Sequence, residues 1–418
     1  MSKFSEVLKS RNFFCLWLGQ IISQLGDRLD QMALIAFIYL RVPGSAYEIA
    51  KILSFTIIPV FLIGPIAGAY VDRWDKRKTL FVCDFLRAAL VLTIPAFLFY
   101  AKNLFPIYFV IFIVFSIGRF FVPAKLSIVP ELVKHEDLLV ANSLVNTTGM
   151  IAAILGFGVS GVVVEWLGAR SGFYLDSLSF LISGTLIFLI TKRHFAHHDS
   201  IKIAGKEIVE VIRKSILTDV KDGIIYFIKN KEIRFTAWMI FALWAALGST
   251  YVVIIVFIQK TLHSATKDLG LLIMFLGIGL FLGSFVYGKF GQGLSHFKAI
   301  FSSLVLSGMM LVIFAVIVHR YPNFIAAATS AFLLGLAISP MMIAANTIVH
   351  NASSSSMLGK IFSSLEIVMH LGFLIFMFIS SVLSAKFTPF IILVVVGSAI
   401  MFLGVINLIY QRKVYRLN

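Results

Sequence analysis

The stretch "GAYVDRWDKRKTL", residues 68–80, interrupts a chain that is otherwise overwhelmingly apolar. Two long hydrophobic runs flank it, and Gly68 stands just ahead of its charges. Six charged side chains crowd into this short segment, namely Asp72, Arg73, Asp75, Lys76, Arg77 and Lys78. Such a cluster between two apolar runs is a binding site, a structural joint or a signal that fixes the side of the membrane on which a loop lies.

The composition is that of a polytopic membrane protein. The 418 residues are 59% hydrophobic and 13% charged, whereas a soluble chain has about 25% charged residues. Apolar runs of about 20 residues cross a bilayer as helices. The basic excess would suggest nucleic acid in a soluble protein, but here it follows the side of the membrane, so no nucleic-acid partner is expected. The two cysteines, Cys15 and Cys83, indicate neither a disulfide framework nor a metal site.

The apolar runs, cut at charged or Pro/Gly-rich joints, number twelve and form two groups of six. They lie near 12–40, 47–71, 79–100, 106–124, 138–165 and 171–191, and near 235–259, 268–290, 297–319, 324–349, 357–385 and 388–411. The predicted fold is therefore an all-α membrane protein with twelve transmembrane helices in two pseudo-symmetric six-helix halves.

Three segments follow from this division: an N-terminal half (1–191), a cytoplasmic linker (192–233) and a C-terminal half (234–418). The linker places apolar residues at four-residue steps between charges, which predicts an amphipathic helix at the membrane interface or packed on the ends of the bundle. Those residues are Ile208, Ile212, Ile216, Val220 and Ile224.

The basic residues orient the spans. With the N-terminus inside, 25 of the 36 Lys and Arg fall in inward segments and 8 in outward ones. This bias predicts that both termini are cytoplasmic. The first apolar run is too long for a cleaved signal peptide and is expected to be retained as a helix.

Residues 68–78 resemble the signature that the major facilitator superfamily carries between its second and third helices, Gly-x-x-x-Asp-Arg-x-Gly-Arg-Arg. Asp75 stands where that pattern has glycine. "GSFVYGKFGQGLSHFKAI", residues 283–300, is a weaker copy at the equivalent joint of the second half, with Tyr287 in place of Asp72. The resemblance covers the whole chain and implies the major facilitator fold.

Four further segments resemble the branch that holds bacterial macrolide-efflux and siderophore-export proteins. They are "LWLGQIISQLGDRLDQMALIAF", "VDRWDKRKTLFVCDFLRAAL", "FVPAKLSIVPELVKHEDLLVANSLV" and "FYLDSLSFLISGTL". "PAK" followed by "IAAILG" is also similar to bacterial lysophospholipid transporters.

The charged segment is interpreted as a conformational latch and a topology anchor. Gly68 would let helix backbones approach closely, and Asp72 would face the positive N-terminal end of a neighbouring helix. The resemblance implies that this neighbour is the eleventh span. Arg73 and Arg77 would hold the loop inside and pair with lipid phosphates. The alternative is a topology anchor without a latch.

Ionisable residues within spans are costly and are functional candidates. Asp27 and Asp30 share a face of the first span while Arg28 points elsewhere, and Glu366 and His370 share a face of the eleventh. The resemblance implies a cavity between the halves, where a carboxylate could exchange a proton and couple transport. Alternatively, Asp27 or Asp30 forms a static pair with Arg28 or a loop cation.

Other charged residues are open to two interpretations. Arg119 resembles the basic residue of the superfamily's fourth-helix motif, which is linked to proton transfer or to the latch; it could equally be a structural partner of Asp72 or Asp84. Asp84 and Arg87, three residues apart, are expected to pair with each other or with the charged 68–80 segment. Asp176 is expected to be a cap or an interfacial group at the outer side.

Candidates for lining an amphipathic substrate pocket are Trp244 and Tyr251 in the seventh span, with Asn146 and Asn346. In the fifth span, Gly156 precedes Phe157 where antiporters of the superfamily have proline, and the small residues there still permit close packing.

The resemblance implies a proton-coupled exporter of amphipathic small molecules, of the drug or siderophore type, that works by alternating access. A lysophospholipid transporter or flippase is the alternative. The expected partners of the protein are its small amphipathic substrate or a lipid, protons and membrane lipids. We expect a monomer in the bacterial cytoplasmic (inner) membrane. The absence of metal-ligand spacing, a nucleotide loop or a Ser-His pair argues against an enzyme, a metal site or a cofactor.

Overall fold

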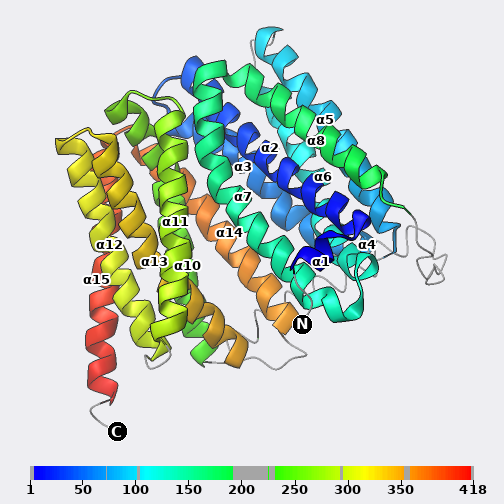
Figure 1. The fold of residues 1–418 in the computed structure, drawn as a ribbon. Coiled ribbons are helices and arrows are strands. Elements are labelled where there is room, and N and C mark those ends of the chain that lie inside the picture. The colour runs from blue at the N-terminus through cyan, green and yellow to red at the C-terminus, as the bar shows by residue number, and fades with distance from the viewer. Residues whose placement is uncertain are drawn as a thin grey trace. The chain divides into compact units, whose positions relative to one another are not determined.

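The computed structural model describes residues 4–71, 73–100, 104–191, 225, 231–291, 295–352 and 358–415. Throughout this part of the chain the regular structure is helical (Figure 1). Almost all of the predicted linker, including the apolar residues of its amphipathic helix, lies outside the described residues.

The first six spans match the predicted runs. They are α2 (Arg11–Arg41), α3 (Ala46–Leu62) with α4 (Gly64–Val71), α5 (Lys76–Tyr100), α6 (Phe105–Leu132), α7 (Leu138–Leu167) and α8 (Ala169–Phe188). The short helix α1 (Phe4–Leu8) precedes them, and a 3-10 turn, η1 (His135–Asp137), precedes α7.

The second six spans also match. They are α10 (Lys231–Leu262), α11 (Lys267–Phe290), α12 (His296–Arg320), α13 (Phe324–Ala352), α14 (Leu358–Leu383) and α15 (Pro389–Tyr415). The predicted all-α architecture of twelve spans is confirmed.

Ten helices of the described part are long and apolar enough to cross a membrane on length and composition alone. The other two spans depart from that standard for identifiable reasons. Helix α2 carries Asp27, Arg28 and Asp30 within its 31 residues. The second span is divided at Ile63 into α3 and α4, since Pro65 has no backbone N–H to continue the hydrogen-bond ladder.

The chain forms two compact units. One comprises residues 1–37 and 51–216, and the other residues 38–50 and 217–418. Equivalent spans pair within each unit: α5 packs with α6 and α8 in the first, and α12 packs with α13 and α15 in the second. The pair α4 and α6 likewise corresponds to α11 and α13. This repetition is that of two related six-helix halves.

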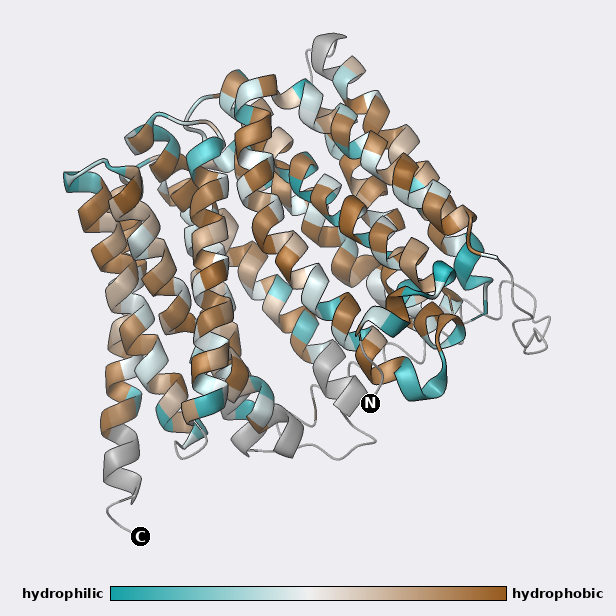
Figure 2. Cartoon of the chain, in the orientation of Figure 1, coloured by the Kyte–Doolittle hydropathy of each residue, from teal (hydrophilic) through white to brown (hydrophobic). Residues whose placement is uncertain are grey.

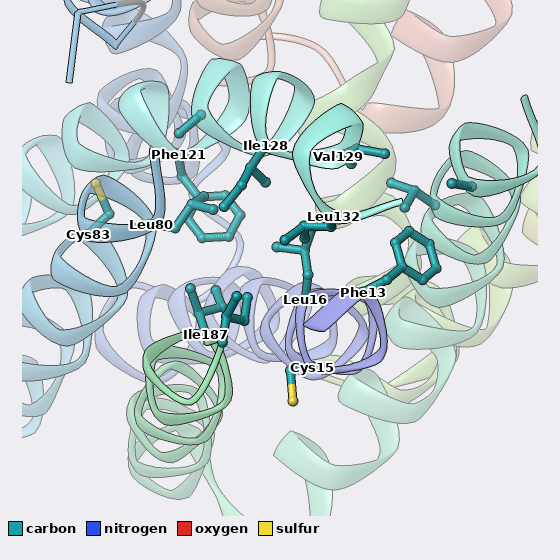
Figure 3. Close-up of a cluster of buried hydrophobic side chains, with 14 of the residues drawn as sticks. Phe13, Cys15, Leu16, Leu80, Cys83, Phe121, Ile128, Val129, Leu132 and Ile187 are labelled. Carbon is teal, nitrogen blue, oxygen red and sulfur yellow. The ribbon is translucent and has the colours of Figure 1, made fainter. Parts of the chain in front are cut away.

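Apolar residues dominate the helices, and the strongly polar residues gather toward helix ends and loops (Figure 2). In the first unit a buried apolar cluster joins α1, the starts of α2, α5 and α7, and the ends of α4, α6 and α8 (Figure 3). Both cysteines belong to this cluster and are free thiols. The cluster fixes the ends of these helices and includes Val71 and Leu80 of the 68–80 segment.

Candidate functional site

A polar cavity of about 340 Å³ lies within the first unit. Helix α2 supplies most of its polar wall, and α5, α6, α7 and α8 supply the rest. Its polar and charged lining residues are Gln20, Ser23, Gln24, Asp27, Arg28, Asp30, Gln31, Arg87, Arg119, Lys125, Asn146 and Asp176. Seven of these side chains are ionisable, which is far more than lipid-facing or packing positions would tolerate.

Arg87 of α5, which lines this cavity, joins two carboxylates. Its guanidinium forms an ion pair with Asp84 on the same helix and lies 3.8 Å, from Nη1 to Oδ1, from Asp27 on α2. Asp84 also accepts a hydrogen bond of 2.6 Å from the Ser183 hydroxyl of α8. The expected Asp84–Arg87 pair is thus present, and it reaches further than expected, to Asp27.

The surroundings hold Arg87 in place. Its guanidinium carbon lies 4.1 Å from the ring centre of Phe180 and 4.9 Å from that of Phe121. The Arg87 side chain is 7% exposed, whereas that of Asp27 is 36% exposed. The buried guanidinium of Arg87 is therefore held in place opposite the Asp27 carboxylate, which is accessible from the cavity.

Asp30 and Asp176 are the most deeply buried carboxyls of the cavity, at 3% and 1% exposed. Asp176 lies inside α8, two turns after its start, so the expectation of a cap or interfacial group is wrong. The Ser179 hydroxyl is 3.3 Å from its Oδ1.

Small residues bring α2 and α8 together at this point. A Cβ atom on Gly26 would collide with the side chains of Ser179 and Asp176. One on Gly172 would lie 2.8 Å from Ala33 Cβ. Close helix contact through small residues is typical of membrane bundles. We call this contact the α2–α8 seam and define it by Gly26, Asp30 and Ala33 of α2 and Gly172, Asp176 and Ser179 of α8.

The helical spacing predicted that Arg28 points away from the face shared by Asp27 and Asp30, but Arg28 lines the same cavity as both. Its Nη1 donates a 3.0 Å hydrogen bond to Gln31 Oε1, and its guanidinium lies 4.7 Å from the centre of the Phe157 ring. Gly156 makes room, since its Cβ position is 3.0 Å from Arg28 Cγ. Among the described residues, Asp27 forms its ion pair with Arg87 rather than with Arg28 or a loop cation. Gly156 and Phe157, the positions at which antiporters of the superfamily have glycine and proline, thus make room for the Arg28 side chain and contact its guanidinium.

Two other predicted residues, Arg119 of α6 and Asn146 of α7, also line the cavity. Four further lining residues on α2 were not predicted from the sequence, namely Gln20, Ser23, Gln24 and Gln31. Their spacing with Asp27 held the signal, because these positions form one continuous polar stripe along a helix.

In the second unit the predicted residues meet at an aromatic cluster between α10 and α14. The Trp244 ring centre lies 5.3 Å from that of His370 and 6.2 Å from that of Phe373. The Tyr251 ring lies 5.4 Å from the Phe373 ring. A Cβ on Gly248 would collide with the Phe373 backbone, so the two helices are in close contact.

The remaining candidates of the second unit are exposed. Glu366 lies on α14, one turn before His370, whose Nδ1 is 2.8 Å from the Glu366 carbonyl oxygen. Asn346 lies on α13. Exposed polar groups on apolar helices remain candidates for contact with a solute.

The charged segment is a joint between helix ends. Asp75 caps α5, since its Oδ1 accepts a 3.0 Å hydrogen bond from the Lys78 N–H. Lys76 forms an ion pair of 3.7 Å with Glu131 of α6. Arg77 donates to the carbonyl oxygens of Ile187 and Phe188 at the end of α8, where a cation is favourable. The aspartate that departs from the family signature is therefore a helix cap.

The other latch candidates are less engaged. Arg73 is exposed. No described atom lies within 4 Å of a Cβ placed on Gly68, so the close backbone approach expected there is not found in the described part of the chain. Asp72 lies outside the described residues. Over those residues there is also no group of three or more His, Cys, Asp or Glu side chains that could hold a metal ion.

Residues 16–292 match the family profile of the Major Facilitator Superfamily. The chain belongs to that superfamily. It is 24% identical to the uncharacterized MFS-type transporter YkuC of Bacillus subtilis (strain 168) over 346 residues, which cover 81% of this chain and 77% of the relative. It is 23% identical to Macrolide efflux protein A of Streptococcus pyogenes over 390 residues, which cover 90% and 89%.

Solved structures of transporters share the fold at low identity. A crystal structure of a mutant peptide transporter POT superposes with a TM-score of 0.75 at 14% identity and covers 100% of this chain and 99% of that chain. A bacterial homologue of the iron transporter ferroportin, in its inward-facing state, gives a TM-score of 0.72 at 14% identity, with coverage of 96% and 98%. The chain is thus a multi-pass membrane transporter of this superfamily.

Proposed function

We propose that the protein is a proton-coupled exporter of amphipathic small molecules that works by alternating access. We place it in the bacterial cytoplasmic membrane with both termini inside. The observation that carries the proposal is the Asp27–Arg87 pair in the polar cavity of the first unit.

This pair has the properties that proton coupling requires. Asp27 can be reached from the cavity, and its negative charge is balanced by a guanidinium that Asp84, Phe121 and Phe180 hold in place. Protonation of Asp27 would remove the electrostatic attraction between its carboxylate and the Arg87 guanidinium. The contact that this pair makes between α2 and α5 would then be released. Loss of the proton would restore the pair. Proton uptake would thus bias the packing of two spans, which is the differential interaction that a conformational cycle needs.

The aromatic cluster of the second unit supports an amphipathic substrate. Trp244, Tyr251 and His370 offer aromatic faces with polar edges, packed on the buried Phe373 ring, and such groups suit solutes that are partly apolar. Among the relatives, Macrolide efflux protein A and the Multidrug resistance protein MdtG of Salmonella, which is 22% identical over 362 residues, have names that point to efflux.

The charged segment is proposed to act as a latch in addition to anchoring the topology. Arg77 joins α5 to the end of α8, and Lys76 joins α5 to the end of α6. A rigid joint at these ends suits a latch built from Gly68, Asp72, Arg73 and Arg77, which would form in one conformational state.

Transport in proteoliposomes tests the proposal. Purified protein is reconstituted, a pH step is applied, and accumulation of a radiolabelled macrolide is compared with that of a labelled lysophospholipid. We expect macrolide accumulation that requires the pH step and disappears when a protonophore is added. Movement of the lysophospholipid alone would favour the alternative function, and macrolide flux without any response to pH would refute proton coupling.

A further inference from the structure

We propose that the α2–α8 seam binds the ammonium group of the transported solute, with Asp30 and Asp176 as its carboxylate ligands. The inference rests on the proposed transport function and narrows its substrate class to organic amines. It concerns a different part of the cavity from the Asp27–Arg87 pair.

The two carboxyls lie in one buried place. Both line the cavity, and both are almost completely shielded from solvent. Gly26 brings α2 against Asp176 Oδ1, and Asp30 stands one turn further along the same face of α2. The seam therefore presents carboxyl groups from two helices to the same small volume.

Neither carboxyl forms an ion pair among the described residues, although the Arg87 guanidinium is near enough to act on Asp176 electrostatically. Asp30 Oδ1 also has no hydrogen-bond partner in that part of the chain. Arg87 is engaged by Asp84 and Asp27, and Arg28 by Gln31 and Phe157. The two remaining cations of the lining, Arg119 and Lys125, belong to α6.

Burying a carboxylate without compensation is costly, and the membrane interior makes it more so. A cationic ligand would provide that compensation. The seam therefore suits a positively charged group that reaches Asp30 and Asp176 from the cavity.

A neutral side chain gives an independent indication of the same chemistry. Gln20 is 4% exposed and lines the cavity, and its Oε1 has no donor among the described residues. Its amide nitrogen lies toward α7, 3.6 Å from the Cβ position of Gly149. Helix α2 thus offers unsatisfied acceptors at two levels, which a solute rich in N–H groups would satisfy.

The same acceptors suit an ammonium better than a bare metal ion. No metal-type group of three or more His, Cys, Asp or Glu stands among the described residues. An alkylammonium needs only two or three acceptors for its N–H groups and can leave its apolar part against Val114, Phe115 and Val145.

The test uses three probes that share one apolar part and differ in the head group: phenylbutylamine, phenylbutanol and phenylbutyrate. Binding to the full-length protein in lipid nanodiscs is measured by equilibrium dialysis, and binding to empty nanodiscs is subtracted. We expect the amine to bind at least about tenfold more tightly than the alcohol or the acid, as a charge-assisted contact would give.

Asp30→Asn and Asp176→Asn should each weaken amine binding about tenfold and leave alcohol binding unchanged. Asp30→Glu, which keeps the charge, should retain part of the affinity, and Glu136→Gln removes an exposed carboxylate outside the cavity as the control. If one Asn variant does not fold, the other variant and the amine-to-alcohol ratio of the wild type still decide the question.

Equal affinity for the amine and the alcohol, or undiminished amine binding in both Asn variants, would overturn the proposal. Such a result would leave the proposed transport function intact, because binding of these probes requires no flux. If pH-driven macrolide accumulation failed while the amine was still bound selectively, the proposed transport function would be refuted and the amine site would stand.

Discussion

Asp27 and Arg87 face each other in the cavity of the first unit, with 3.8 Å between the carboxylate Oδ1 and the guanidinium Nη1. The two side chains differ in access: Asp27 is 36% exposed and Arg87 is 7% exposed. Arg87 also holds Asp84, which is fully buried. Arg87 therefore has one buried partner, Asp84, and one partner that is accessible from the cavity, Asp27. Substitutions that break these two contacts should have different effects.

Asp27→Asn removes the exchangeable charge and imitates the protonated carboxyl permanently. We expect the variant to fold, to exchange labelled substrate across the membrane and to lose accumulation against a gradient, since only uphill transport needs the proton cycle. Counterflow and pH-driven uptake in the same proteoliposomes measure the two activities. Asp27→Glu is the control that keeps a titratable group. Full accumulation in Asp27→Asn would show that this carboxyl is structural.

Arg87→Met tests the contact between Arg87 and Asp84. The substitution leaves Asp84 buried without its cation, so we expect a loss of about 3–5 kcal/mol in the free energy of unfolding. Adding Asp84→Asn should recover part of this loss, because the pair is then removed as a unit. Thermal unfolding of the two single variants and the double variant in detergent gives the cycle. Strictly additive losses would mean that the two side chains do not depend on each other.

The sequence alone predicted the twelve spans, because a weakly charged apolar run of bilayer length has a strong preference for the membrane interior. It also predicted the pair Asp84–Arg87, since residues three apart on a helix meet. It could not predict that Arg87 reaches Asp27, because that contact depends on how α2 and α5 pack.

The position of Asp176 is a second feature that the sequence alone did not predict correctly. The sequence placed it near the end of a span, whereas α8 begins at Ala169 and carries the residue into the interior. A signal was present nonetheless. Gly172, Asp176, Ser179 and Ser183 recur at helical spacing on one face, and a small polar face within a span predicts close contact with another helix. Which helix makes that contact is tertiary information.

Gly26→Ala is predicted to open the α2–α8 seam. The new methyl group would collide with Ser179 and Asp176, so we expect a destabilisation of about 1–3 kcal/mol. Gly64→Ala is the matched control, since no described atom lies within 4 Å of its Cβ position. Comparison of their melting temperatures gives the answer. Equal melting temperatures would contradict the tight packing at Gly26.

Asp75→Ala should weaken the start of α5 by about 1 kcal/mol, the usual cost of a lost helix cap. Asp75→Ser keeps an oxygen that can accept from the Lys78 N–H and should restore most of the stability. If the segment acts as a latch, the alanine variant should also transport more slowly while binding substrate with unchanged affinity. Chemical unfolding and initial transport rates are measured on the same preparations. A serine variant as unstable as the alanine variant would exclude the capping function.

Glu366→Gln extends the coupling test to the second unit. Glu366 is an exposed carboxyl on α14, and one turn later His370 has its Nδ1 2.8 Å from the Glu366 carbonyl and its ring 5.3 Å from that of Trp244. The imidazole is thus held by its own helix and by an aromatic ring, so substitution of the Glu366 side chain should leave that arrangement intact. If Glu366 participates in coupling, Glu366→Gln should keep substrate exchange and lose pH-driven accumulation, and Glu366→Asp should keep both. Combined with Asp27→Asn, the double variant should be no worse than the more impaired single variant, because one broken proton cycle suffices to uncouple transport. Full accumulation in Glu366→Gln with its loss in Asp27→Asn would assign coupling to the first unit alone, and full accumulation in both would remove these two carboxyls from the mechanism.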